Sequence, residues 1–135
     1  MRNDRVVFPP PAVSVLHYDD LAGMRELVRY ALADDARIRL LASARTADEL
    51  LDQVAVFSPE VVVVDLAMPD RDGLELIPEI QSIAPSTAIV VFSAFLSTRM
   101  ERVAEELGAA AYVEKGARLQ ELCDAIVNAP APRTG

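Results

Sequence analysis

The chain has 135 residues, and its 13 basic and 21 acidic side chains give a formal net charge of −8. This length suits one domain with one core, and an apolar fraction of 52% is too high for intrinsic disorder. The acidic balance argues against direct nucleic-acid binding, the short apolar runs exclude a transmembrane helix, and a lone cysteine excludes an internal disulfide, so we expect a soluble cytoplasmic domain.

Short apolar runs alternate with helical patterns along most of the chain. Residues 1–12 predict an extended arm, because three consecutive prolines cannot enter a central strand, and residues 129–135 have the composition of a tail or linker. Continuous runs rich in β-branched residues are typical of strands buried on both faces. Between the arm and the tail, residues 13–128 form the predicted domain, with strands at 13–18, 38–44, 61–64, 87–92 and 110–113.

A helical pattern follows each predicted strand. Thr46 with Glu49, and Thr98 with Glu101, have the spacing of a capping box and predict two helix starts. Gly108 predicts a helix end, and residues 74–84 predict a weaker helix that contains a proline. Five strands with five following helices predict an α/β fold with a doubly wound parallel sheet, covered by helices on both faces in three layers.

Side chains that carry chemistry stand at the carboxyl ends of these strands, where open parallel sheets place their ligand sites. Asp19 and Asp20 follow the first strand, Asp65 the third, Ser93 the fourth, and Lys115 follows the fifth within two residues. Three carboxylates repel one another, and Mg²⁺, which is usually completed by phosphate oxygens, would relieve the repulsion. An Asp can itself accept a phosphoryl group. We therefore expect phosphoryl chemistry, with the ammonium and the hydroxyl contacting phosphoryl oxygens.

The turn after the first strand, YDDLAGM, is acidic rather than glycine-rich, and Walker A and GxGxxG patterns do not occur. Such a turn would repel a nucleotide phosphate unless a metal intervened. This argues against a nucleotide- or flavin-binding version of the architecture. Lys115 is the single lysine beside twelve arginines, which suits a site that needs a compact charge in a tight space.

These residues resemble, in order and spacing, the receiver domain of two-component response regulators, from about residue 13 to residue 127. The segment VVVVDLAMPDRDGLEL is similar to the family's phosphoacceptor strand and loop. The resemblance implies the flavodoxin-like strand order 2-1-3-4-5 and makes Asp65 the phosphoacceptor. It further implies that Asp20 and Asp65 ligate Mg²⁺ (or Mn²⁺), with Asp19 in support and the backbone carbonyl of Ala67 as a further ligand.

By the same resemblance, Lys115 and Ser93 assist catalysis, and Ser93 acts with Tyr112 as the switch. Ala67 and Phe95 occupy the two positions at which the family tunes the lifetime of the phosphoryl group. Neither side chain can act as a base or orient water by a hydrogen bond. Our hypothesis is slow autodephosphorylation, with Phe95 shielding the site.

The function implied is that of a signalling receiver. A sensor histidine kinase or phosphotransfer protein would supply phosphohistidine, and the chain would catalyse its own phosphorylation and dephosphorylation without being a classical enzyme. The phosphoryl group would switch the face formed by the fourth helix, fifth strand and fifth helix, about residues 98–127. That face is also the candidate surface for a homodimer, and neither a membrane nor nucleic acid is an expected partner.

Two alternatives stay open. The first is a phosphorylation-independent receiver that acts as a constitutive protein-interaction module. It stays open because Gly116 stands where the family usually has proline and because the first strand is polar, with His17 in its interior. We interpret His17 itself as a strand residue with a satisfied ring. A Mg²⁺-dependent phosphatase of the aspartyl-phosphate type usually needs a second Asp two residues after the nucleophile, where this chain has Ala67. We interpret Asp70 and Asp72 as turn formers rather than ligands.

Overall fold

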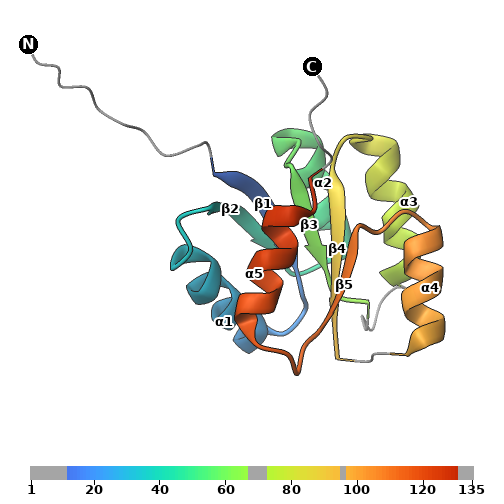
Figure 1. Ribbon diagram of the computed structural model, residues 1–135. Helices are drawn as coiled ribbons and strands as arrows, with labels where there is room; N and C mark the ends of the chain where they lie inside the picture. Colours follow the sequence, from blue (N-terminus) through green and yellow to red (C-terminus); the bar gives the residue numbers. More distant parts are fainter. Residues whose placement is uncertain (1–11, 67–72, 95–96, 131–135) are drawn as a thin grey trace, which may run out of the picture.

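The computed structural model describes residues 12–66, 73–94 and 97–130 (Figure 1). Its strands pair in the order β2-β1-β3-β4-β5, and every pair is parallel. This confirms the predicted fold class and strand order. The expected arm and tail lie almost entirely outside the described residues. The strands are β1 (Val13–Tyr18), β2 (Ile38–Ala44), β3 (Val61–Val64), β4 (Ala88–Ser93) and β5 (Ala111–Glu114).

The helices cover the sheet on both faces, as predicted (Figure 1). Successive side chains of a strand point to opposite faces, so β3 contributes Val62 and Val64 to one core cluster and Val61 and Val63 to the other. All four of these valines are fully buried. Helices α2, α3 and α4 pack on the first cluster, and α1 and α5 on the second. The helices are α1 (Ala22–Ala33), α2 (Ala47–Phe57), α3 (Gly73–Ile83), α4 (Thr98–Glu106) and α5 (Leu119–Asn128).

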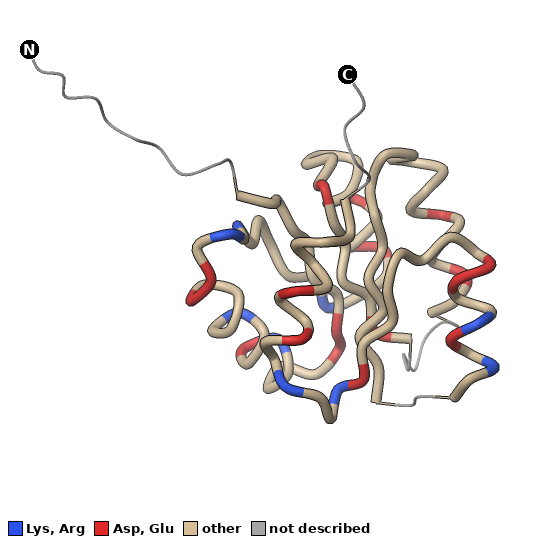
Figure 2. Tube along the Cα trace, in the orientation of Figure 1, with Lys and Arg blue, Asp and Glu red and all other residues tan. Residues whose placement is uncertain are grey.

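Strands β1, β2 and β3 have the predicted bounds, whereas β4 and β5 each begin and end one residue later than predicted. Thr87 stays outside β4: its backbone N–H donates to the Ala84 carbonyl at 3.0 Å in the preceding turn, and its hydroxyl donates a buried hydrogen bond of 2.6 Å to the carbonyl of Pro59. Charged residues lie mostly on the helices and connecting loops and are almost absent from the strands (Figure 2). Within the described ranges, no helix is long and apolar enough to cross a membrane.

The helix ends test the predicted caps. The Thr46 hydroxyl accepts from the backbone N–H of Glu49 at 3.2 Å, which confirms the start of α2. The prediction for α4 is wrong: Ser97 is the cap, accepting from the N–H of Met100 at 3.1 Å, and Thr98 is the first helical residue. Gly108 has a φ of 113°, which confirms that it stands where the chain leaves α4.

Candidate functional site

The two central strands bring two carboxylates together at the carboxyl edge of the sheet. Asp19 directly follows β1, and Asp65 directly follows β3, its neighbour in the sheet. Backbone hydrogen bonds continue one step past both strands, because the N–H of Asp65 donates to the Tyr18 carbonyl and the N–H of Asp19 donates to the Ala44 carbonyl, each at 3.2 Å. The sheet itself therefore fixes both aspartates.

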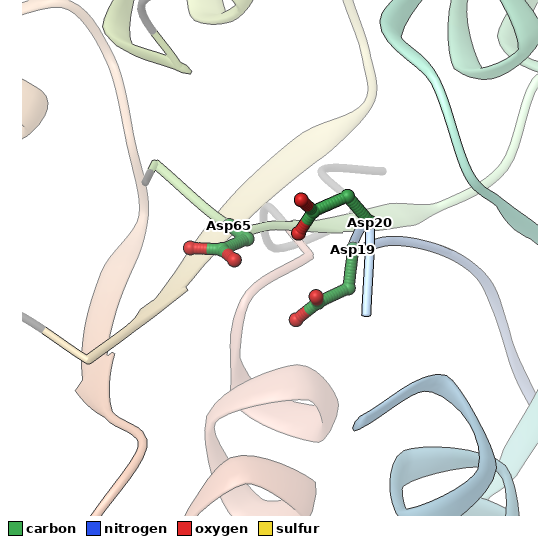
Figure 3. A group of neighbouring side chains, drawn as sticks. All are labelled: Asp19, Asp20 and Asp65. Atoms are coloured by element: carbon green, nitrogen blue, oxygen red, sulfur yellow. The ribbon is translucent and has the colours of Figure 1, made fainter. Parts of the chain in front are cut away.

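Asp20 joins these two residues to form an acidic cluster. Asp19, Asp20 and Asp65 each offer a carboxylate oxygen, and these oxygens lie within 4.8 Å of one another (Figure 3). Asp19 is fully buried and Asp65 is 3% exposed, whereas Asp20 is the most exposed of the three. Mg²⁺ binds oxygens at about 2.1 Å, so oxygens on one ion are about 3–4 Å apart. A small closure would let this donor set hold the ion, which fits the hard-oxygen chemistry of Mg²⁺.

Lys115 connects two of the three carboxylates. It follows β5 directly, where its backbone N–H donates to the Ser93 carbonyl at 2.8 Å. Its Nζ donates to Oδ2 of Asp19 at 2.7 Å and to Oδ2 of Asp65 at 2.8 Å, and it lies 6.0 Å from the centre of the Phe92 ring. Burial lowers the pKa of Lys115, but the hydrogen bonds to both carboxylates outweigh burial and raise it above its ordinary value. The ammonium is therefore charged at neutral pH.

Arg25 is a part of the site that the sequence did not reveal to us. It lies one turn into α1, and its Nη1 donates to the backbone carbonyl of Asp19 at 2.8 Å. The signal in the sequence is an arginine five residues after the acidic pair, which also fits an ordinary solvent-facing helix position. The contact depends on the angle at which α1 leaves β1, and residue spacing does not supply that angle.

Ser93 and Tyr112 contact each other in this structure. Ser93 is the fully buried last residue of β4, and Tyr112 lies on the neighbouring strand β5. Burial raises the pKa of Tyr112, and a hydrogen bond with the Ser93 side chain opposes that rise. The two residues predicted as the switch are thus joined through their hydroxyl groups.

His17 corrects one expectation. It lies in β1 two residues before Asp19 and is 1% exposed, and neither ring nitrogen has a hydrogen-bond partner among the described residues. The predicted satisfied ring is therefore wrong. Desolvation by burial, helped by the positive charge of Lys115, lowers the pKa of His17 to about 4. The ring is neutral at pH 7 and lies close to the charged site.

The backbone of Gly73, at the start of α3, lies close to the backbone of the two residues that follow β3. A Cβ atom built on Gly73 would lie 2.4 Å from Cα and 2.8 Å from the carbonyl oxygen of Leu66, and 3.0 Å from the carbonyl oxygen of Asp65. Glycine is required here for close approach of two backbone segments. The predicted ligand Ala67 and the predicted shield Phe95 lie outside the described residues, as do Asp70 and Asp72.

Comparisons with known proteins agree on one family. A family model described as the response regulator receiver domain matches residues 15–127. The chain is 33% identical over 105 residues to the protein-glutamate methylesterase/protein-glutamine glutaminase 1 of Syntrophus aciditrophicus, covering 76% of this chain and 30% of that protein. It is 36% identical over 104 residues to the corresponding protein 2 of Carboxydothermus hydrogenoformans, covering 76% and 29%. The chain thus spans less than a third of the length of these relatives.

Solved structures give the same result. The signal receiver domain of the putative response regulator NarL from Mycobacterium tuberculosis matches with a TM-score of 0.81 at 26% identity, covering 88% of this chain and 96% of that one. The response regulator domain of Thermotoga maritima CheB matches with a TM-score of 0.83 at 21% identity, covering 92% and 100%. The second likeness concerns the fold alone.

Proposed function

Since the chain belongs to the response regulator receiver family, we propose that it accepts a phosphoryl group on Asp65 from the phosphohistidine of a sensor kinase or phosphotransfer protein. One observation carries the proposal: Lys115 bridges Asp19 and Asp65 inside a cluster of three carboxylates at the carboxyl edge of the sheet. Such a cluster combines a nucleophilic carboxylate, a fixed cation and a set of hard oxygen ligands.

The chemistry follows from these positions. A carboxylate oxygen of Asp65 attacks phosphorus, the P–N bond breaks, and its electron pair goes to the donor imidazole, which leaves an acyl phosphate on Asp65. Lys115, already at hydrogen-bond distance from Asp65, donates to a phosphoryl oxygen and offsets its charge. Positioning and charge neutralisation supply most of the catalysis in phosphoryl transfer.

Asp20 and Asp65, with Asp19 in support, would hold Mg²⁺. The carbonyl of Ala67 stays a predicted further ligand. When bound, the ion neutralises charge on the phosphoryl oxygens and orients the group for transfer. Asp19 already has both carboxylate oxygens engaged, by the N–H of Leu21 at 3.0 Å and by Lys115, which supports its secondary role.

The output we propose is a change in the face formed by α4, β5 and α5. Ser93 would turn its hydroxyl to the phosphoryl group and give up the hydrogen bond that now joins it to Tyr112. Tyr112 would then repack between β5 and α4, and the altered face would be read by a partner or by a second copy of the chain. The phosphoryl group thus biases a two-state surface.

An acyl-phosphate donor with Mg²⁺ tests the proposal. We expect hydroxylamine-labile phosphate on the wild-type chain and none on Asp65→Asn, because the amide is not a nucleophile. Asp52→Asn, an exposed position on α2, is the matched control and should label like the wild type. A folded wild-type chain that takes no label would contradict the proposal and favour the constitutive interaction module. The slow decay expected from Ala67 and Phe95 would appear as a phosphoryl half-life much longer than that of fast chemotaxis-type receivers.

A further inference from the structure

The carboxylate of Asp20 is directed toward that of Asp65 (Figure 3), yet no hydrogen bond or ion pair to another described residue holds its side chain. The contacts that do act on Asp20 are on its backbone, which sets the direction in which its Cα–Cβ bond points. The peptide group before its Cα is held by the Arg25 guanidinium, which donates to the Asp19 carbonyl at 2.8 Å. The peptide group that joins Asp20 to Leu21 is held as well, because the N–H of Leu21 donates to Oδ1 of Asp19 at 3.0 Å.

Apart from its backbone carbonyl, every polar group of Asp19 already has a partner within the sheet edge, Leu21 or Lys115. Its N–H donates to the Ala44 carbonyl on β2, and its Oδ2 accepts from Lys115. The carbonyl of Asp19 is the remaining group, and it belongs to the same rigid peptide plane as the nitrogen of Asp20. Arg25 is itself fixed in the first turn of α1, where its N–H donates to the Leu21 carbonyl at 3.0 Å.

We infer that Arg25 is a positioning residue that orients the Asp20 carboxylate toward Mg²⁺, an inference that rests on the metal site proposed above. A fixed positive charge beside a cation site weakens cation binding by repulsion. A residue that orients a ligand strengthens binding, and its loss typically lowers metal affinity 10- to 100-fold. Charge and positioning therefore predict changes of opposite sign when Arg25 is replaced.

Calorimetric titration with Mg²⁺ distinguishes the effect of the Arg25 charge from its effect as a positioning residue. We expect Arg25→Met to raise the Mg²⁺ dissociation constant about 10-fold. Arg25→Lys keeps the charge and one donor for the same carbonyl, so it should recover much of the affinity. Arg29→Met removes the same charge from the same helix, where Arg29 pairs with Glu26 and is 54% exposed, and should leave the constant within about twofold of wild type.

A measurement without metal gives a second readout. If Arg25 holds the turn, the Leu21 amide should exchange its hydrogen faster in metal-free Arg25→Met than in wild type, while amides in the middle of α1 keep their rates. Uniformly faster exchange throughout α1 would show a general loss of helix stability and overturn the inference. So would unchanged or tighter Mg²⁺ binding by Arg25→Met when the wild type binds Mg²⁺. A wild-type chain that does not bind Mg²⁺ would overturn the proposed metal site and this inference with it.

Discussion

The imidazole of His17 is buried beside the acidic cluster. Neither of its nitrogens has a hydrogen-bond partner among the described residues. A buried polar group without a hydrogen bond costs about 1–3 kcal/mol of stability. The ring lies in β1 with Val63 as its partner in β3 and Ser43 as its partner in β2. The position thus combines the burial of a core residue with the chemistry of a titratable one.

We predict that His17→Leu raises the free energy of unfolding by about 2 kcal/mol at pH 7.5 in the absence of divalent cations. The pKa of His17 is about 4 in the folded chain against an ordinary 6.5. Below pH 6.5 the unfolded chain therefore binds a proton that the folded chain does not. Wild-type stability falls as the pH drops from about 6.5 to 4, by up to roughly 1.4 kcal/mol per pH unit, and the variant lacks this loss.

Urea denaturation of both chains at pH 7.5, 6 and 5 measures this difference, and titrations common to both chains cancel in the comparison. The gap between wild type and His17→Leu should widen as the pH falls. Parallel stability curves would show that His17 keeps an ordinary pKa and has a partner that the structure does not reveal.

At the scale of elements, the starts of α3 and α4 show what backbone packing adds to local sequence. Ser97 and Thr98 both carry a hydroxyl near the start of the helical pattern, and the Thr98 pattern with Glu101 is the better match to a capping box. In the structure, however, the Glu101 N–H already donates to the Ser97 carbonyl at 2.9 Å. Ser97 is nevertheless the cap, because the chain is extended there, with φ −125° and ψ 145°, and becomes helical at Thr98. The backbone conformation at Ser97, rather than the side-chain pattern, thus marks where α4 begins.

The contact of α3 with the end of β3 gives a prediction with a matched control. A Cβ on Gly73 would overlap the backbone of Leu66, so Gly73→Ala should lower the free energy of unfolding by about 1–3 kcal/mol. Gly23, in the first turn of α1, has nothing within 4 Å of such a Cβ. Gly23→Ala should therefore raise the free energy by up to about 1 kcal/mol, since alanine is the better helix former.

Urea denaturation of the two glycine variants measures both changes. Because a Cβ at position 73 would lie 3.0 Å from the carbonyl oxygen of Asp65, we expect Gly73→Ala to slow phosphorylation even under conditions in which the variant is fully folded. Equal stability of the two variants would mean that the start of α3 adjusts without strain.

For the whole molecule, the site concentrates negative charge in a chain whose net charge is already −8. Within the described residues, Lys115 donates to two of the three carboxylates, and Arg25 donates to the backbone carbonyl of Asp19. A bound divalent cation would therefore stabilise the fold as a whole, because only the folded chain brings the carboxylates together.

We predict that Mg²⁺ at about 100 times its dissociation constant raises the free energy of unfolding by about 2.7 kcal/mol. Asp20→Asn should lose most of this gain, because it removes the most exposed and least engaged ligand. Thermal unfolding with and without MgCl₂, against NaCl of equal ionic strength, makes the measurement. An equal shift of the melting temperature in wild type and variant would place the effect away from the acidic cluster.

The sequence by itself determined the alternation of strands and helices, the strand order through its family resemblance, and the residues that end the strands. Those features depend on neighbours along the chain: apolar runs such as residues 61–64, and polar side chains such as Asp19, Asp65 and Lys115 that follow them. Because parallel strands end at a common edge, residue positions alone were enough to gather the site.

Only the tertiary structure decided how that site is supported. The bond from Arg25 to the Asp19 carbonyl, the unpartnered ring of His17 and the closure of Gly73 on Leu66 involve backbone atoms or surroundings contributed by other elements. Every residue offers the same backbone groups, so no pattern of side chains marks which carbonyl is bonded or which Cβ would clash. The packing angles between the helices and the sheet determine which of these backbone groups come into contact. Those angles exist only in the folded chain.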